Sequence, residues 1–138
     1  VTDKIRTDLN SKHASIVATQ KGVRHHVVNL QKKMILNKGV VMDGRDIGTV
    51  VIPNAELKIY LTASVESRAK RRFDDNVKRG LDADLEKISK EIQTRDYHDM
   101  NREESPLKQA DDAVLIDTSE MTIEDVVDKI CSMANSRM

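Results

Sequence analysis

The sequence predicts an α/β domain with a mostly parallel sheet. Three short apolar runs, at residues 40–42, 58–62 and 113–117, have the length and composition of buried strands. Amphipathic helical patterns lie before, between and after them. Helices that alternate with short, wholly apolar strands are typical of a parallel sheet covered by helices. A length of 138 residues suits one such domain, or a large piece of one.

Composition narrows the possible partners. Lys plus Arg and Asp plus Glu both number 23, so no global charge attracts nucleic acid or an anionic membrane. The chain has no Trp, one Phe and two Tyr, which leaves few rings on which bases could stack. No apolar stretch approaches the roughly 20 residues of a membrane span. The single cysteine, Cys131, allows no internal disulfide and favours a reducing, cytoplasmic setting. We therefore expect neither nucleic acid nor a membrane as a partner.

The first 40 residues are expected to be helical. Residues 1–19 show mixed patterns that predict short helical turns with loops between them. From residue 20 an apolar stripe of helical spacing begins, formed by Val23, Val27, Leu30 and Met34. Gly39 lies where a helix stop is expected. Arg24 is one residue off the stripe, so its default interpretation is a solvated helix charge.

Charged residues follow the first predicted strand directly. Residues 40–42 are succeeded by Asp43, Arg45 and Asp46, with a glycine among them. Polar groups at the end of a buried strand suggest a site over the edge of the sheet. The alternative, which composition leaves open, is a charged hairpin turn that contacts only water.

A strongly charged helix is predicted after the second strand. Ser64 is a good N-cap and Gly80 a good end. Three arginines lie within about one turn of each other in this helix: Arg68, Arg71 and Arg72. They form either a solvated helix face or an anion-binding arm.

The helix predicted over 84–101 has a stripe that is apolar at first and charged towards its end, while staying on one face of the helix. Its apolar positions are Leu85, Ile88 and Ile92, and the same spacing continues to Arg95, Asp99 and Arg102. Such a face is expected to leave the core and enter a cleft. The alternative is an exposed ion pair between Arg95 and Asp99, which contributes only about 0.3–0.5 kcal/mol.

The end of the chain is predicted to add one strand and one helix. Ser105 and Pro106 interrupt the helical pattern before the strand at 113–117. Thr122 and Asp125 approximate a capping box. The apolar stripe of the last helix comprises Ile123, Val127, Ile130, Met133 and Ala134.

Several kinds of site are excluded by the motifs. One cysteine and four histidines show no metal-ligand spacing, and there is no G-x-S-x-G elbow. The segment from Gly39 to Asp46 imitates G-x-x-x-x-G-K-[ST], but its middle is strand-like. Asp46 also stands in place of the hydroxyl that holds magnesium.

A set of arginines and carboxylates remains: Arg24, Arg45, Arg95 and Arg102 with Asp43, Asp46 and Asp99. Arginine forks bind phosphate oxygens, and carboxylates accept from amino and hydroxyl groups or hold hydrated magnesium. This inventory suits phosphoryl transfer, which depends on positioning and charge neutralisation.

Ordered motifs now indicate a family. The segments are Ser15-x-Val17-Ala18, Val23-Arg24, Asp43-Gly44-Arg45-Asp46-Ile47-Gly48-Thr49-Val50-Val51, Ser64-Val65-Glu66-x-Arg68-Ala69-x-Arg71-Arg72, Arg95-Asp96-x-x-Asp99-x-x-Arg102, Ser105-Pro106-Leu107 and Asp111-Asp112-Ala113. In order and spacing the chain resembles the bacterial cytidylate kinases of the nucleoside monophosphate kinase group. The resemblance implies a P-loop kinase-like three-layer α/β fold. It also implies transfer of a phosphoryl group from ATP with Mg²⁺ to CMP or dCMP.

The resemblance implies a role for each matching residue. The expected nucleotide contacts are Ser15, Arg24, Asp46 and Arg102, the last three near the cytosine. Arg95 and Asp99 are expected near the sugar, with Arg95 also close to the transferred phosphoryl group. Arg45 would grip the CMP phosphate, and Asp43 would hold magnesium through water. Arg45, Arg95 and Arg102 are the expected catalytic residues, whereas Arg68, Arg71 and Arg72 would begin a mobile lid over ATP.

One departure from the family affects the expected activity. The family's glycine-rich Lys-Ser phosphate loop is absent from these 138 residues, so we expect an N-terminally truncated chain with negligible turnover alone. Residues 1–19 would end the CMP-binding segment, 20–63 and 103–138 would form the core, and about 64–102 the lid region. The alternative is a non-catalytic remnant that binds a nucleotide or partner. The intact enzyme is expected to be a monomer, and an exposed sheet edge would allow association of the fragment.

Overall fold

The computed structural model describes residues 8–36 and 39–137, and the chain divides into two compact units. The first unit comprises Val1–Pro53 and Asp99–Lys108, and the second comprises Asn54–His98 and Gln109–Met138.

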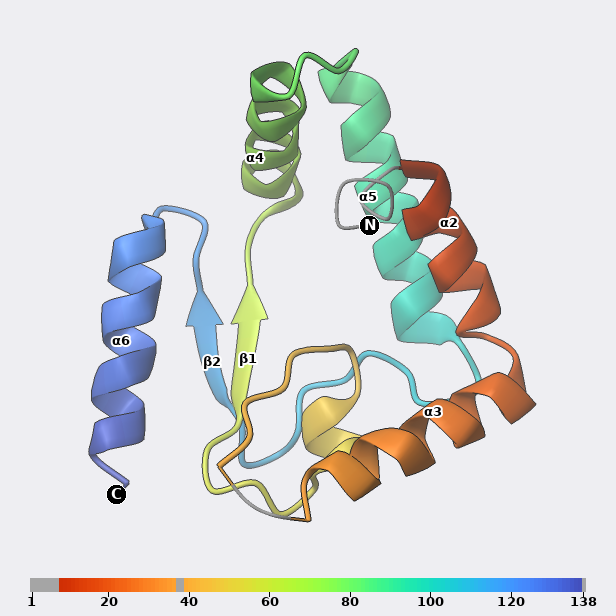
Figure 1. Ribbon diagram of the computed structural model, residues 1–138. Coiled ribbons are helices and arrows are strands. Elements are labelled where there is room, and N and C mark those ends of the chain that lie inside the picture. The colour runs from red at the N-terminus through yellow and green to blue at the C-terminus, as the bar shows by residue number, and fades with distance from the viewer. Residues whose placement is uncertain (1–7, 37–38, 138) are drawn as a thin grey trace. The chain divides into compact units, whose positions relative to one another are not determined.

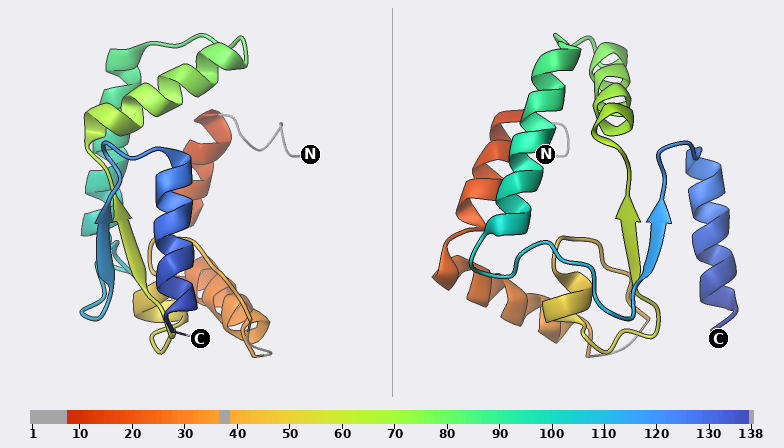
Figure 2. Two further views of the ribbon diagram at one scale, coloured as in Figure 1. Left: turned by 90° about the vertical axis from the view of Figure 1, so that its left-hand side faces the viewer. Right: turned by 180° about the vertical axis from the view of Figure 1, so that it is seen from behind.

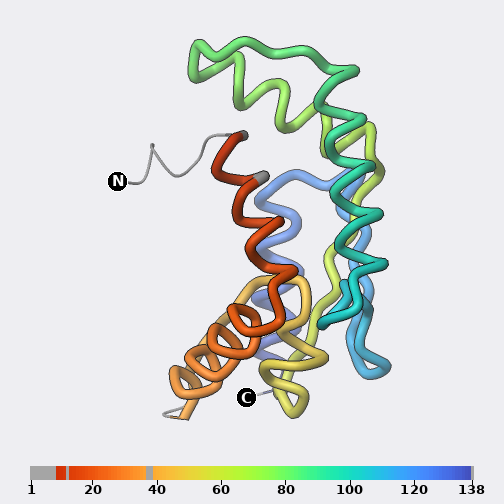
Figure 3. The backbone as a smooth tube through the Cα atoms, turned by 90° about the vertical axis from the view of Figure 1, so that its right-hand side faces the viewer, coloured from red at the N-terminus to blue at the C-terminus, as the bar shows by residue number. Residues whose placement is uncertain are grey.

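The first unit begins with two helices joined by a tight turn. Helix α2 (Asp8–Val17) leads through residues 18–20 into α3 (Lys21–Met34), as Figure 3 shows. The Oγ1 of Thr19 donates to the carbonyl of Ile16 at 2.8 Å and so closes α2. One ten-residue helix therefore replaces the short turns expected for this segment, and the expectation for residues 1–7 lies outside the described residues.

The covered side of α3 is not the predicted one. Every residue of the expected stripe is exposed: Val23, Val27, Leu30 and Met34. Val28 is buried instead, and α3 contacts η1, a π-helical turn at Ile47–Val51. Periodicity identifies an apolar face but does not determine which element covers it. The burial prediction for this helix was therefore wrong within the described chain.

The predicted strand at 40–42 is also absent. These residues have no regular secondary structure, and Val41 is 99% exposed. An extended segment becomes a strand only when a neighbour pairs with its backbone groups. The sheet of the described chain contains only β1 and β2. The turn η1 follows, with the amides of Val50 and Val51 both donating to the carbonyl of Asp46.

The second unit contains the sheet. Strands β1 (Ile59–Thr62) and β2 (Val114–Asp117) are parallel, in a register that pairs Ile59 with Val114 and Thr62 with Asp117 (Figure 1). Ile116 of β2 is almost fully buried. Two of the three predicted strands and the α/β class with a parallel sheet are thus confirmed.

The helices after β1 are α4 (Val65–Lys78), α5 (Leu85–Asn101) and α6 (Ile123–Asn135). Figure 2 shows the loop that joins α4 to α5 in the second unit, and α5 ends with three residues of the first unit. The predicted helix signals are confirmed. Ser64 caps α4, Gly80 follows it with φ +68°, and Thr122 and Asp125 form the capping box of α6.

The stripe of α6 is only partly covered, because Ile123 and Val127 are exposed. Among the residues that the structure describes, no helix combines the length and the hydropathy required to cross a membrane.

Candidate functional site

Arg24 and Asp46 form a covered ion pair in the first unit. Arg24 lies on α3 one turn before the buried Val28, and Asp46 immediately precedes η1. The Nη2 of Arg24 contacts the Oδ2 of Asp46, and the two side chains are 14% and 3% exposed. The default interpretation of Arg24 as a solvated charge was therefore wrong. Removing either partner would leave a buried charge uncompensated.

A second ion pair joins Arg45 to the last turn of α5. The Nε of Arg45 donates to the Oδ2 of Asp99 at 2.8 Å. The side chain of Asp99 is 7% exposed, whereas that of Arg45 is 42% exposed. The carbonyl of Asp99 accepts from the amide of Leu107 at 2.7 Å, which fixes the chain after α5.

Arg102 lies near the second carboxylate oxygen of Asp99. Its side chain is 8% exposed, and its Nη1 lies 3.9 Å from the Oδ1 of Asp99. Its Nε donates to the carbonyl of Ser105 at 2.8 Å and so holds the turn in which Ser105 has φ +51°. The prediction that the charges at the end of this helix continue its covered face is confirmed for Asp99 and Arg102.

These residues act as one electrostatic cluster, which we call the arginine cluster: Arg24, Arg45, Asp46, Asp99 and Arg102. Burial, followed by the nearby Arg24, lowers the pKa of Arg102, while Asp99 and Asp46 oppose this shift. Three guanidinium groups against two carboxylates leave one positive charge in excess. Arg45 is the only member exposed by more than a third, so an incoming anion would meet Arg45 first.

The covered face of α3 also carries buried polar atoms that make no hydrogen bond in the described part of the chain. Within the described residues, the Nε of Arg24 and the Oε1 of Gln31 are buried without a hydrogen-bond partner. Gln31 was not among the residues selected from sequence. Its seven-residue spacing from Arg24, which places both on one helix face, was the available signal. Buried polar atoms of this kind normally have a partner, and a bound ligand can supply one.

The other predicted acceptor-site residues lie outside this cluster. Ser15 is half-buried on α2, and Asp43 is exposed three residues before Asp46. Arg95 is half-buried on α5 one turn before Asp99, but it belongs to the second unit. The expected place of Arg95 near the sugar and the transferred phosphoryl group therefore remains a prediction.

Asp43 is the one residue for which the sequence predicted a role in holding magnesium. No group of three His, Cys, Asp or Glu residues with the geometry of a metal site occurs in residues 8–36 and 39–137. Magnesium keeps several of its waters and often takes only one or two protein carboxylates besides substrate phosphates. One exposed carboxylate fits that mode of binding.

The three arginines predicted to begin a lid belong to the second unit. Arg68 makes a two-pronged contact with Asp96, at 2.9 and 2.6 Å, and its Nε donates to the carbonyl of Ala63 at 3.0 Å. Arg71 donates to oxygens of the loop after β2. Arg72 is half-buried on the same helix.

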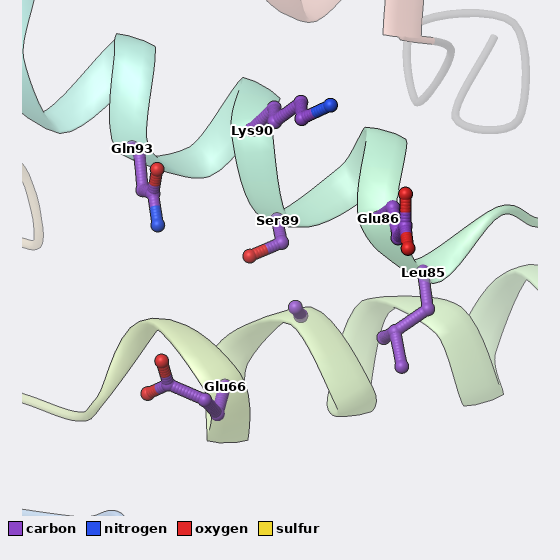
Figure 4. Close-up of a pocket in the computed structure, with 7 residues that line it drawn as sticks. Glu66, Leu85, Glu86, Ser89, Lys90 and Gln93 are labelled. Carbon is purple, nitrogen blue, oxygen red and sulfur yellow. The ribbon is translucent and has the colours of Figure 1, made fainter.

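A groove of about 380 Å³ separates α4 from α5 on the second unit. Figure 4 shows Glu66 of α4 and Ser89 and Gln93 of α5 at this groove. Its remaining lining mixes Glu86 and Lys90 with apolar groups, so it lacks the arginine forks of the cluster.

The second unit thus has a parallel α/β sheet, and the first unit has a covered cluster whose arginine forks match the geometry of phosphate oxygens. Residues 1–136 match the family described as cytidylate kinase. The chain belongs to the cytidylate kinase family. It is 51% identical over all of its 138 residues to a cytidylate kinase of Streptococcus pneumoniae (strain Hungary19A-6), and it spans 62% of that relative's length.

Proposed function

We propose that the complete protein is a (d)CMP kinase. It transfers the γ-phosphoryl group of ATP to CMP or dCMP, giving ADP and CDP or dCDP. Family membership and identity to a cytidylate kinase support this class of reaction. The observation that carries the proposal is the arginine cluster, which combines a covered ion pair with one accessible guanidinium.

The cluster suits a nucleotide because its two ends differ in chemistry. Arg24 and Asp46 offer a donor and an acceptor in a covered place, which suits the polar edge of a cytosine. Arg45 offers a fork where the cluster reaches solvent, which suits the phosphate. Asp99 and Ser15 are proposed to contact the sugar, and Arg102 to lie against the base. In the structure Arg45 donates to Asp99, and the phosphate of the bound nucleotide would replace part of this contact.

The donor side of the reaction is proposed from the family alone. ATP would bind with Mg²⁺, held through water by Asp43. The ion neutralises charge on the transferred phosphoryl group. Arg95 is proposed to bind the same group while it moves, and Arg72 to contact ATP from α4. Closure of a lid over the nucleotides would exclude water. We place this activity in the cytoplasm and expect the intact enzyme to be a monomer.

One observation favours a second candidate for the 138 residues themselves. They contain no glycine-rich Lys-Ser phosphate loop, which supplies backbone donors and a lysine to ATP in phosphoryl-transfer enzymes of this type. Without such a loop the chain would bind a nucleotide or a partner but would not turn over. An in-frame loop of this kind in the complete coding sequence would favour the kinase.

The test compares the complete protein with the 138-residue chain. Formation of ADP is followed with ATP, Mg²⁺ and CMP, and cytidine replaces CMP as the matched control because it lacks the acceptor phosphate. We expect turnover at an ordinary kinase rate, about 1–100 s⁻¹, for the complete protein with CMP only. The short chain should form no ADP above background. A complete protein that forms none with CMP, dCMP or UMP would refute the proposal.

A further inference from the structure

A polar network ties the start of α4 to the carboxyl ends of both strands. The amide of Ser64 donates to the Oγ of Ser119 at 2.9 Å, and the Oγ of Ser67 donates to the carbonyl of Ser119 at 3.2 Å. The Oγ1 of Thr118 donates to the carbonyl of Thr62 at 3.0 Å. The loop after β2 is thus bound to the loop after β1.

Among the side chains of this network, Arg71 donates the most hydrogen bonds to the loop after β2. Its Nη1 donates to the Oγ1 of Thr118 at 3.2 Å. Its Nη2 donates to the carbonyls of Thr118 and Met121, the latter at 3.4 Å. Thr118 is 7% exposed, so its contacts with Arg71 are largely covered. Three oxygens of one short loop therefore share the terminal nitrogens of one guanidinium.

We propose that Arg71 is a positioning residue that holds the loop at residues 118–121 against the end of β2, and that it does not bind the phosphates of ATP. This inference rests on the proposed kinase function, because only that function gives α4 an ATP ligand to bind. Three of the five N–H donors of Arg71 bind oxygens of its own chain, so a two-pronged phosphate contact through Nη2 would compete with the carbonyls of Thr118 and Met121. In parallel sheets, ligands bind outside the carboxyl ends of the strands. A loop fixed at that place shapes the site without contributing a charge to it.

Arg68 shows why the assignment is specific to one arginine. Its two terminal nitrogens bind Asp96 of α5, so its charge is already matched by a carboxylate. Within the described residues Arg71 has no carboxylate partner and binds neutral oxygens instead. Its role depends on the shape of the fork more than on its charge, and a lysine cannot reproduce that shape.

The test uses Arg71→Lys and Arg71→Gln in the complete protein, with two measurements. Hydrogen exchange at the amides of Ser119 and Met121 reports the loop, because these amides bond to Asp117 and Thr118. We expect both variants to exchange about 5- to 30-fold faster there. Equilibrium binding of adenosine and of ATP should weaken by the same factor, to within about twofold, because loss of a positioning residue affects both ligands alike.

Arg79→Lys is the matched control, since Arg79 lies on the surface just after α4 and its side chain pairs with the exposed Asp75. It should change neither measurement. Unchanged exchange in the Arg71 variants overturns the proposal, as does a loss of ATP affinity at least tenfold larger than that of adenosine. If the unsubstituted protein binds neither ligand, the proposed function fails, while the exchange comparison still decides whether Arg71 holds the loop.

Discussion

Two arginines of the first unit and one arginine of the second unit use their guanidinium groups in different ways. In the first unit, Arg24 and Arg45 face carboxylates within a covered cluster. In the second unit, Arg71 faces carbonyl and hydroxyl oxygens of its own chain. An arginine that is paired with a carboxylate can exchange that anion for a phosphate. An arginine bonded to neutral oxygens instead fixes a loop. For Arg24, Arg45 and Arg71 we therefore expect the partner of the guanidinium to distinguish ligand binding from positioning.

The strongest test of this difference is Arg24→Met. Asp46 would keep its charge in a place where it is 3% exposed, so we expect a loss of about 3–5 kcal/mol in the free energy of unfolding. Urea unfolding of the variant measures the effect. The double variant Arg24→Met with Asp46→Leu should recover most of the loss, because no unpaired charge remains.

The control for Arg24→Met is an exposed pair on the other unit. Arg79→Met breaks the contact of Arg79 with Asp75, 3.3 Å long and well exposed, and should cost less than about 1 kcal/mol. Equal losses in Arg24→Met and Arg79→Met would mean that the cluster is no better shielded than the surface.

The next largest effect is expected from Arg95→Met in the complete enzyme. Arg95 belongs to the second unit but is proposed to bind the transferred phosphoryl group, so it tests whether that unit also holds a catalytic arginine. We expect kcat to fall about 10²- to 10³-fold with no change in the urea midpoint. Steady-state kinetics measure this effect. Turnover equal to that of the parent would remove Arg95 from the catalytic residues.

A smaller and more selective effect is expected from Arg45→Lys. The variant keeps a positive charge but loses the fork that is proposed to bind the CMP phosphate. CMP affinity should fall about 10- to 100-fold, while cytidine affinity should stay the same. Calorimetric titration with each ligand separates the two outcomes. A parallel loss for cytidine would mean that Arg45 orders the cluster, as Arg71 is proposed to order its loop.

Local signals predicted those parts of the fold that depend on near neighbours in sequence. The caps at Ser64 and Thr122 and the end at Gly80 were all found, because each requires one residue type within a few positions. The apolar runs at 58–62 and 113–117 also predicted strands, and these two segments pair with each other although they are distant in sequence. In the candidate site, the helical spacing of Asp99 and Arg102 correctly predicted their covered face.

The predictions that failed concern features that depend on contacts with residues distant in sequence. The apolar run at 40–42 has strand composition, but no pattern within it supplies the neighbour that a strand requires. The stripe on α3 identified an apolar face, whereas the described structure covers the side that carries Arg24 and Val28. Gln31 was missed because its seven-residue spacing from Arg24 becomes informative only when the covered side of α3 is known.

The smallest expected effect is that of low pH on hydrogen exchange in the loop at residues 118–121. The Oγ and then the amide of Ser119 donate to Asp117 and lower the pKa of its carboxyl below the ordinary 3.8. A carboxyl with a lowered folded pKa contributes stability that is complete above its ordinary pKa and is lost as the pH falls through the lowered value. Exchange at the Ser119 amide, corrected for the intrinsic rate, should therefore stay constant from pH 8 to about pH 5 and accelerate only below about pH 4. Asp117→Asn should abolish that acid step. An acid step that persists in the variant would assign it to another group of the network.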